Sequence, residues 1–217
     1  MGRQERRQRE QQELRQSILD AAREIALTEG WRNVTMRKIA DRIEYSHPAI
    51  YDYFKNKEVL LLELVHEGFR ILDSALRAAQ AQGKDPVEAI HLVGRAYLQF
   101  AWRYPELYSV MYGLDGAAFV APEAHGEGQQ IEDVVAATVK DVLDAQNLST
   151  SHLADRVNIL WSIAHGLVTL TMADRITGGQ AKAMQLLERA FQDMLLSWQH
   201  DLEGPASASS MQGAISS

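Results

Sequence analysis

Apolar residues recur along most of the chain at the spacing of an amphipathic helix, and no stretch alternates with period two for long enough to predict a strand. Gly and Pro residues separate these stretches, as is typical of helix ends. The predicted helices cover about 10–29, 35–43, 46–54, 57–83, 85–104, 105–112, 131–145, 151–176 and 181–200. The pattern therefore predicts an all-α fold.

The first of two short helices in the N-terminal part is predicted from a narrow apolar face. Its apolar residues fall at i, i+3, i+4 and i+7, at Met36, Ile39, Ala40 and Ile43. Thr35 precedes them and can serve as the N-cap, because its hydroxyl oxygen can accept a hydrogen bond from a free backbone N–H. These positions predict a helix of about two turns.

A tight turn leads to a second short helix with two different faces. Ser46 can cap it, and Pro48 fits its first turn, where the missing N–H has no helical partner to lose. Ile50 and Phe54 are four positions apart and are expected to be buried. The opposite face carries side chains that can reach base edges and phosphates, namely His47, Ala49, Tyr51 and Tyr53. We therefore expect a helix-turn-helix whose second helix enters a DNA groove; a helical hairpin at the edge of a bundle is the alternative.

The charge of the chain is divided unevenly. Residues 1–57 contain 12 Lys and Arg against 9 Asp and Glu, whereas residues 58–217 contain 10 against 20. The net charge of −7 therefore conceals a basic N-terminal part, which is the part expected to bind DNA. The first nine residues hold one acid and four arginines, Arg3, Arg6, Arg7 and Arg9. They predict a flexible basic arm that follows a phosphate backbone or a minor groove, with a solvated tail as the alternative.

The composition excludes several classes of protein. The chain has no cysteine, which excludes disulfides, thiolate catalysis and cysteine-ligated zinc and makes a cytoplasmic location the expectation. The N-terminus lacks the apolar segment of a secretory signal. Residues 157–173 are uncharged, but they are at the short limit for a membrane span and include several polar residues. We expect them to form a helix buried within protein, and we expect no membrane partner.

The sequence contains no arrangement of residues that indicates catalysis. It has no glycine-rich phosphate loop, no HExxH motif and no nucleophile elbow. Its seven histidines include no pair at i, i+4, so a metal site would need ligands from distant helices. We therefore expect neither an enzyme nor a bound metal or cofactor.

Three N-terminal segments resemble the TetR/AcrR family of transcriptional repressors: ILDAAREIALTEG, VTMRKIADRI and IYDYFKNKEVLL. The resemblance covers about residues 17–64. Its most specific part is the last segment, in which a Tyr, a second aromatic residue two positions on, a Phe and then a Lys occur at fixed spacing. The resemblance implies DNA contacts, which together with the helical pattern we expect at Thr35, Arg37, Ser46, His47, Pro48, Ala49, Tyr51, Tyr53 and Lys57.

Two positions depart from the pattern of this family. The turn between the short helices usually holds a glycine where this chain has Glu44. The second helix usually has Gly or Thr near Pro48 and Ala49. The base contacts made by relatives are therefore not carried over to this chain.

The C-terminal part is similar, in fewer residues, to the Trp-x-x-x-His-Gly signature of a ligand-binding domain found in part of the family. The matching residues are Trp161, His165 and Gly166. The resemblance implies that Trp161 and His165 contact an effector from one face of their helix, with core packing as the alternative. An aromatic and Met-rich group could line the same pocket or belong to a core: Tyr97, Phe100, Trp102, Tyr108, Met111 and Tyr112.

Together these features predict three parts of the chain. They are a basic arm and helix-turn-helix domain at 1–57, a helical effector-binding and dimerisation domain at 58–203, and a disordered tail at 204–217. The expected protein is a homodimeric repressor that binds a palindromic operator in double-stranded DNA and is released by an apolar or aromatic small molecule. We expect its dimer contacts around Trp161 and Phe191. A dimeric helical sensor or adaptor that does not regulate DNA is the alternative.

Overall fold

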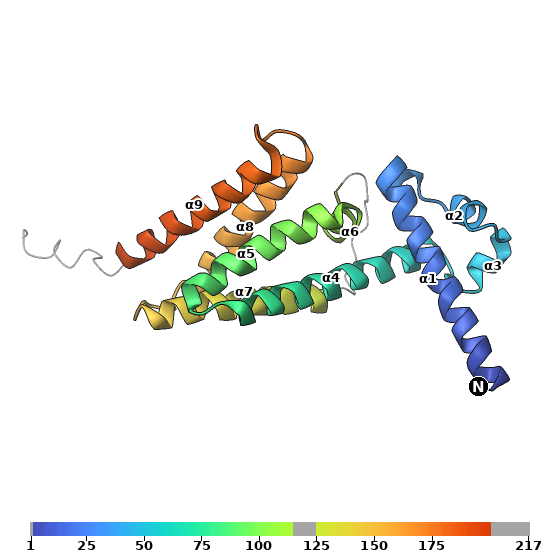
Figure 1. Ribbon diagram of the computed structural model, residues 1–217, viewed down its shortest axis with the longest axis horizontal. Coiled ribbons are helices and arrows are strands. Elements are labelled where there is room, and N and C mark those ends of the chain that lie inside the picture. Colours follow the sequence, from blue (N-terminus) through green and yellow to red (C-terminus); the bar gives the residue numbers. More distant parts are fainter. Residues whose placement is uncertain (1, 115–124, 201–217) are drawn as a thin grey trace, which may run out of the picture. The chain divides into compact units, whose positions relative to one another are not determined.

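The structure is a computed structural model that describes residues 2–114 and 125–200 (Figure 1). Every regular element in these residues is a helix, which confirms the predicted all-α class. No helix among them is long and apolar enough to cross a membrane. The predicted tail at 204–217 lies outside the described residues.

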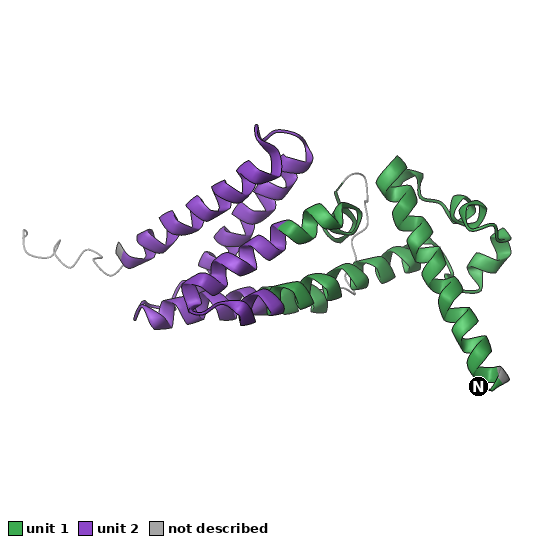
Figure 2. Ribbon diagram, in the orientation of Figure 1, with its two compact units in different colours: residues 1–77, 99–133 green, residues 78–98, 134–217 purple. Residues whose placement is uncertain are grey.

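The chain packs into two compact units, coloured separately in Figure 2. Of the described residues, the first unit contains those within 2–77 and 99–133, and the second contains those within 78–98 and 134–200. These units are defined by how the chain packs, whereas the domain boundary expected at residue 57 divides a DNA-binding part from an effector-binding part. That boundary therefore stays a prediction.

The first helix, α1 (Arg3–Glu29), is longer than the predicted 10–29. It ends where predicted: Gly30 has a φ of 82°, and its N–H donates to the carbonyl oxygen of Ala26 at 2.9 Å. The four arginines of the expected flexible arm lie in the first turns of α1 instead, because Arg, Gln and Glu residues of high helix propensity precede residue 10 without a break. One face of α1 is apolar and buried, at Ile18, Ala21, Ala22 and Ile25.

A 3₁₀ turn at Trp31–Asn33 leads to α2 (Met36–Arg42), the first of the two predicted short helices. Thr35 is its N-cap, as predicted: the hydroxyl oxygen accepts a hydrogen bond from the N–H of Lys38 at 3.2 Å. The buried residues of α2 include Ile39, which is fully enclosed. One side of this short helix is therefore held against the core of the first unit.

The second short helix is α3 (His47–Tyr51), which has Pro48 in its first turn as predicted but ends before the predicted residue 54, so that Tyr53 and Phe54 lie just after it. Ser46 occupies the N-cap position, but its side chain makes no cap hydrogen bond. Ile50 and Phe54 are both completely buried, which confirms the predicted inner face. The helix-turn-helix is therefore present, and its inner face is held by these two side chains.

The turn between α2 and α3 contains Glu44, where the family's pattern usually has a glycine. Glu44 has a φ of 59°, in the left-handed region that favours glycine. Its N–H donates to the carbonyl oxygen of Asp41 at 3.4 Å, and the N–H of Tyr45 donates to that of Ala40 at 3.0 Å. These are the two hydrogen bonds of a Schellman motif. The chain keeps the geometry of the turn without its glycine.

Longer helices follow in the rest of the described chain. They are α4 (Lys57–Gln82), α5 (Pro86–Arg103), α6 (Pro105–Met111), α7 (His125–Ala145), α8 (Leu153–Met172) and α9 (Gly179–His200). Their ends lie close to the predicted ones except in two helices: α7 begins at His125 rather than at residue 131, and α8 ends at Met172 rather than at residue 176. Asp85 caps α5, since its Oδ1 accepts from the N–H of Glu88 at 2.8 Å.

An ion cluster joins α1 to α4 and α6 within the first unit. The guanidinium of Arg23 lies 2.9 Å from Oε1 of Glu67 and 2.8 Å from Oε1 of Glu106. Nε1 of Trp31 donates to the carbonyl oxygen of Glu106 at 3.0 Å. Glu106 is only 5% exposed, and burial raises the pKa of Glu67. One arginine therefore bridges two carboxylates largely out of solvent, which fixes three helices at one point.

The left-handed Glu44 gives a test of the turn. We expect Glu44→Gly to be more stable than Glu44→Ala by about 1 kcal/mol, because only glycine adopts a positive φ without strain from a Cβ atom. Both variants lose the carboxylate, so the alanine variant controls for its charge. Urea unfolding followed by circular dichroism measures the difference. Equal midpoints would contradict this conformation of residue 44.

Candidate nucleic-acid interface

Six of the nine residues predicted to contact DNA lie on α3 or directly beside it. Tyr51 is 44% exposed, and the rings of His47 and Tyr51 meet edge to face with their centroids 5.0 Å apart. The other predicted residues near α3 are exposed or half-buried: Ser46, Pro48, Ala49 and Tyr53. This face of α3 points outward because Ile50 and Phe54 occupy the core on the other side. It offers an imidazole and phenol hydroxyls to a partner.

Two further predicted contacts come from the start of α2. Thr35 is exposed, and its hydroxyl accepts from the N–H of Lys38, so the O–H remains able to donate. The side chain of Arg37 is 84% exposed, and its Nε lies 4.0 Å from Oδ2 of Asp41, at the outer limit of an ion pair. Both side chains can therefore reach a phosphate without losing a buried contact.

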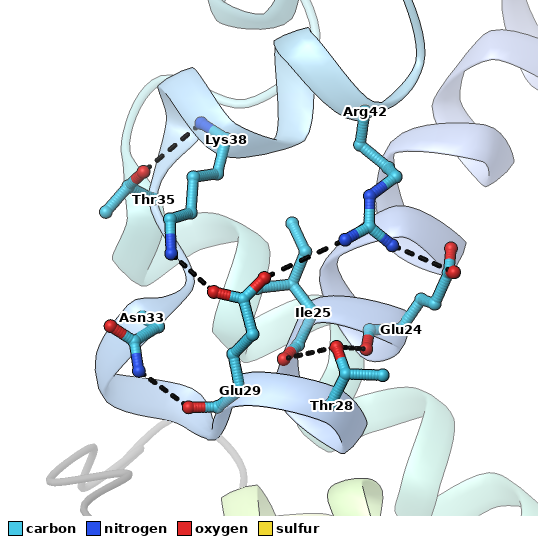
Figure 3. A network of polar contacts seen from close by, with 8 residues as sticks. All are labelled: Glu24, Ile25, Thr28, Glu29, Asn33, Thr35, Lys38 and Arg42. Carbon is cyan, nitrogen blue, oxygen red and sulfur yellow. Dashed lines mark hydrogen bonds and ion pairs between the residues drawn. The ribbon is translucent and has the colours of Figure 1, made fainter.

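The other two cations of α2 belong to a polar network that joins this helix to the end of α1 (Figure 3). Nζ of Lys38 lies 2.6 Å from Oε2 of Glu29, and Nη1 of Arg42 lies 2.8 Å from Oε1 of Glu24. Nη2 of Arg42 is also 3.8 Å from Glu29. The hydrogen bond from Lys38 lowers the pKa of Glu29, which keeps this carboxylate ionised. No pattern in the sequence predicts these pairs, because the partners lie on different helices and no helical spacing links them.

Lys57, a predicted phosphate contact, has a partner within the chain. Its Nζ donates to the carbonyl oxygen of Trp31 at 3.1 Å. Burial lowers the pKa of Lys57, which is consistent with an ammonium group partly withdrawn from water. Lys57 therefore ties the start of α4 to the turn that precedes α2, and this hydrogen bond restricts the positions that its ammonium group can take.

Five of the eight predicted effector contacts lie in the first unit. They range from buried to half-buried and are Phe100, Trp102, Tyr108, Met111 and Tyr112. The rings of Tyr108 and Tyr112 are 4.7 Å apart, and Phe69 lies 6.4 Å from Tyr112. A Cβ atom on Gly68 would clash with Sδ of Met111, so α4 and α6 pack closely here. Phe100 and Tyr108, at 3% and 0% exposure, are core residues of this unit.

The other three predicted effector contacts lie together in the second unit. Nε1 of Trp161 donates to Oη of Tyr97 at 3.2 Å, and the rings of Trp161 and His165 are 5.5 Å apart. Burial lowers the pKa of His165, which favours its neutral ring. Trp161 is 44% exposed, and this argues against the alternative that it is a core residue.

The exposed apolar residues of α8, and the half-buried residues beside them, fall on two flanks of the helix, because successive residues are about 100° apart. The first, which we call the open flank, contains Ile159, Ile163, Gly166 and Leu170. The second, which we call the tryptophan flank, contains Trp161, His165 and Met172. Ile159 and Leu170 are 51% and 49% exposed, and a Cβ atom on Gly166 would meet no atom within 4 Å. The open flank is therefore accessible along its length.

Phe191, an expected dimer contact, is buried in the structure. Phe191 of α9 is 4% exposed and packs within the second unit, with its ring 5.7 Å from that of His91. A Cβ atom on Gly94 would lie 2.7 Å from the Phe191 ring, so the helices meet closely here. Phe191 is buried inside this unit and is not available to a second copy of the chain. Leu186 and Leu196 are the exposed apolar residues of α9, at 38% and 56%.

Two family models match the chain. The model for bacterial regulatory proteins of the tetR family matches residues 18–64, which include the helix-turn-helix. The model for a tetracyclin repressor-like C-terminal domain matches residues 90–194. Both models describe parts of the same kind of protein, and together they extend over most of the described chain.

Individual proteins show the same likeness. The HTH-type transcriptional repressor KstR of Rhodococcus jostii is 32% identical over 101 residues, which are 46% of this chain and 47% of KstR. The chain therefore spans about half the length of the curated relatives it matches.

Solved structures share the fold over more of their length. A protein of unknown function from Rhodococcus sp. RHA1 has a TM-score of 0.74 at 22% identity, with 86% of this chain and 95% of that one covered. The TetR family transcriptional regulator PfmR of Thermus thermophilus has a TM-score of 0.66 at 19% identity, with 83% and 97% covered. At these identities the likeness concerns the fold alone.

Proposed function

This chain belongs to the TetR family of bacterial regulatory proteins, and from this we propose that it is a homodimeric repressor that leaves a palindromic operator when a small molecule binds. The observation that carries the proposal is the helix-turn-helix of α2 and α3. Its inner face is buried through Ile50 and Phe54, and its outer face exposes His47 and Tyr51. A helix pair with this division of faces can dock in a major groove without loss of its own core.

The proposed roles of the α3 residues follow from their chemistry. His47 can exchange hydrogen bonds with base edges, whereas Pro48 and Ala49 can make only apolar contacts, such as those with thymine methyl groups. The hydroxyl groups of Tyr51 and Tyr53 can donate to phosphates. α2 would then cross the backbone, as the first helix of such a pair does.

The proposed dimer contact is the open flank of α8. Ile159 and Leu170 expose large apolar side chains, and Gly166 between them allows the backbone of another helix to approach. A two-fold symmetric contact places the same surface of both copies together, so two recognition helices would face the two halves of a palindrome.

The proposed effector contact is the tryptophan flank of α8. Trp161 and His165 lie beside Tyr97 of α5, so an indole, a neutral imidazole and a phenol come together in the second unit. These groups favour an apolar or aromatic molecule that carries at least one hydrogen-bonding atom. The effector and the second copy of the chain would use opposite flanks of one helix.

Tyr51→Phe tests the proposed contact with DNA, since it removes a hydroxyl group and little packing. The variant should bind about a hundredfold more weakly to duplexes that the wild-type protein selects from a random pool, because a homodimer loses one hydrogen bond to a charged group, worth about 1.5 kcal/mol, in each half-site. Gel-shift titration measures this affinity. Tyr45→Phe, at a tyrosine outside α3 that is 50% exposed, is the matched control. Wild-type affinity in Tyr51→Phe would remove this hydroxyl from the interface.

Leu170→Glu tests the proposed dimer contact. A carboxylate on the open flank should yield folded monomers, because it would be buried against an apolar surface of the second copy. Met172→Glu on the tryptophan flank is the matched control, since Met172 is 40% exposed and should tolerate the same change as a dimer. Light scattering measures both masses. A dimer of folded Leu170→Glu would place the interface elsewhere.

Trp161→Ala tests the proposed effector contact. The variant should remain dimeric and bind operator, but it should no longer release DNA when a small molecule recovered from the purified wild-type protein is added. Replacement of a core tryptophan by alanine lowers the free energy of unfolding by about 3 to 5 kcal/mol. Because Trp161 is 44% exposed, we expect a smaller loss in Trp161→Ala. Thermal melting, light scattering and operator binding are measured together. Loss of the dimer or of the fold would contradict an effector contact.

A further inference from the structure

Six cationic side chains lie on the helix-turn-helix or directly beside it in the chain, between the end of α1 and the start of α4. They are Arg32, Arg37, Lys38, Arg42, Lys55 and Lys57. The sequence alone does not distinguish the cations that can contact phosphates from the cations that cannot. The structure separates them by their partners within the first unit.

Three of these cations are held by partners within the protein. Lys38 pairs with Glu29 at 2.6 Å, and Arg42 pairs with Glu24 at 2.8 Å (Figure 3). Lys57 donates to the carbonyl oxygen of a residue in the 3₁₀ turn. The two ion pairs compensate the charges of Lys38 and Arg42, and the hydrogen bond restricts where the ammonium group of Lys57 can lie.

The other three cations have no such restraint. Arg32 and Lys55 are exposed, and neither has an acidic partner among residues 2–114 and 125–200. Arg37 is 84% exposed, with Asp41 no closer than 4.0 Å. Arg32 lies in the 3₁₀ turn before α2, and Lys55 lies in the loop after α3, so these two cations flank the helix pair in the chain.

We propose that Arg32 and Lys55, with Arg37, supply the phosphate contacts of this helix-turn-helix, and that Glu24 and Glu29 keep Lys38 and Arg42 out of the DNA interface. The inference rests on the proposed function and adds Arg32 and Lys55 to its site. It also gives the acidic residues at the end of α1 a role in setting the affinity for DNA.

The physical basis is the release of counterions from DNA. A cation that approaches a phosphate displaces condensed counterions, and this release provides the salt-dependent part of the affinity. Lys38 paired with Glu29 forms a unit without net charge, so it displaces few counterions. The same holds for Arg42 paired with Glu24. Arg32 and Lys55 carry charges that no acid in the described chain neutralises, so their contacts should dominate the salt dependence.

Lys57 supports this arrangement through the turn that carries Arg32. Its ammonium group holds the carbonyl oxygen of Trp31, which is the residue next to Arg32. Lys57 is therefore a positioning residue in this proposal, acting on the 3₁₀ turn and not on a phosphate. This differs from the direct contact that the sequence predicts.

The experiment compares matched neutral variants of the full chain. Arg32→Gln and Lys55→Gln are compared with Lys38→Gln and Arg42→Gln, which remove the same charge from the same region. The probe is a short fluorescent duplex of random sequence, because phosphate contacts do not depend on sequence. Fluorescence anisotropy gives the affinity over a series of KCl concentrations, and circular dichroism melting verifies the fold of each variant.

The expected result is a difference in slope. One phosphate contact contributes about 0.9 to the slope of log affinity against log salt, and a homodimer carries each contact twice, so Arg32→Gln and Lys55→Gln should each flatten the slope by about 1.8. Lys38→Gln and Arg42→Gln should leave the slope near the wild-type value. Because two variants represent each group, loss of fold in one leaves the comparison intact.

A reciprocal variant gives a readout that a purely structural role of Glu29 would not produce. Glu29→Gln releases Lys38, so the variant should bind the duplex more tightly than the wild-type protein and with a steeper slope. The double variant Glu29→Gln/Lys38→Gln should lose this gain, which assigns it to Lys38 and not to the removal of a negative charge.

The outcomes separate this inference from the proposed function. Equal flattening of the slope in Lys38→Gln and in Arg32→Gln or Lys55→Gln would overturn the inference, because the total charge and not individual contacts would then set the slope. A gain that persists in the double variant would also overturn it. Absence of any salt-dependent binding by the wild-type protein would instead overturn the proposed function, together with everything that rests on it.

Discussion

The arrangement of the first unit depends on one guanidinium group. Arg23 of α1 bridges Glu67 of α4 and Glu106 of α6, and the indole of Trp31 donates to the backbone of the same Glu106. Removal of the arginine would leave two carboxylates facing each other in a site that is largely closed to water, which is strongly unfavourable. α1 also carries α2 through the ion pairs of Glu24 and Glu29. A displacement of α6 relative to α4 must therefore either break this cluster or move α1, and with α1 the helix pair proposed to contact DNA.

Ion pairing also affects the charge of the helix-turn-helix in this acidic chain. Most acidic residues lie after residue 57, and the acids at the end of α1 are engaged by Lys38 and Arg42. These pairs are half-exposed, so each adds little to the free energy of unfolding. Their main effect is on charge, because the cations of the helix-turn-helix that they do not include remain uncompensated. In the proposed interface, these pairings would lower the salt-dependent part of the affinity for DNA.

The sequence predicts the elements of this fold well where a local rule governs them. The cap at Thr35, the burial of Ile50 and Phe54 and the glycine stop after α1 each depend on a few neighbouring residues. The partners of Lys38, Arg42 and Lys57 depend on which helices meet in space, and no spacing in the chain encodes that. Phe191 illustrates the same limit, because the pattern identifies an apolar face without identifying what covers it. Sequence patterns therefore predict the residues of a surface better than they predict the partner of that surface.

The division of α8 into two flanks has a consequence for the proposed response to an effector. A ligand changes an equilibrium only when it binds one conformation more tightly than another. The tryptophan flank and the open flank belong to one rigid helix, so a ligand that shifts or rotates α8 to improve its contacts with Trp161 would move Ile159 and Leu170 by the same rotation. Packed helix surfaces accept few alternative registers, and a small rotation can therefore favour a different contact with the second copy. The helix itself would couple the effector to the dimer, without a separate pathway through the core.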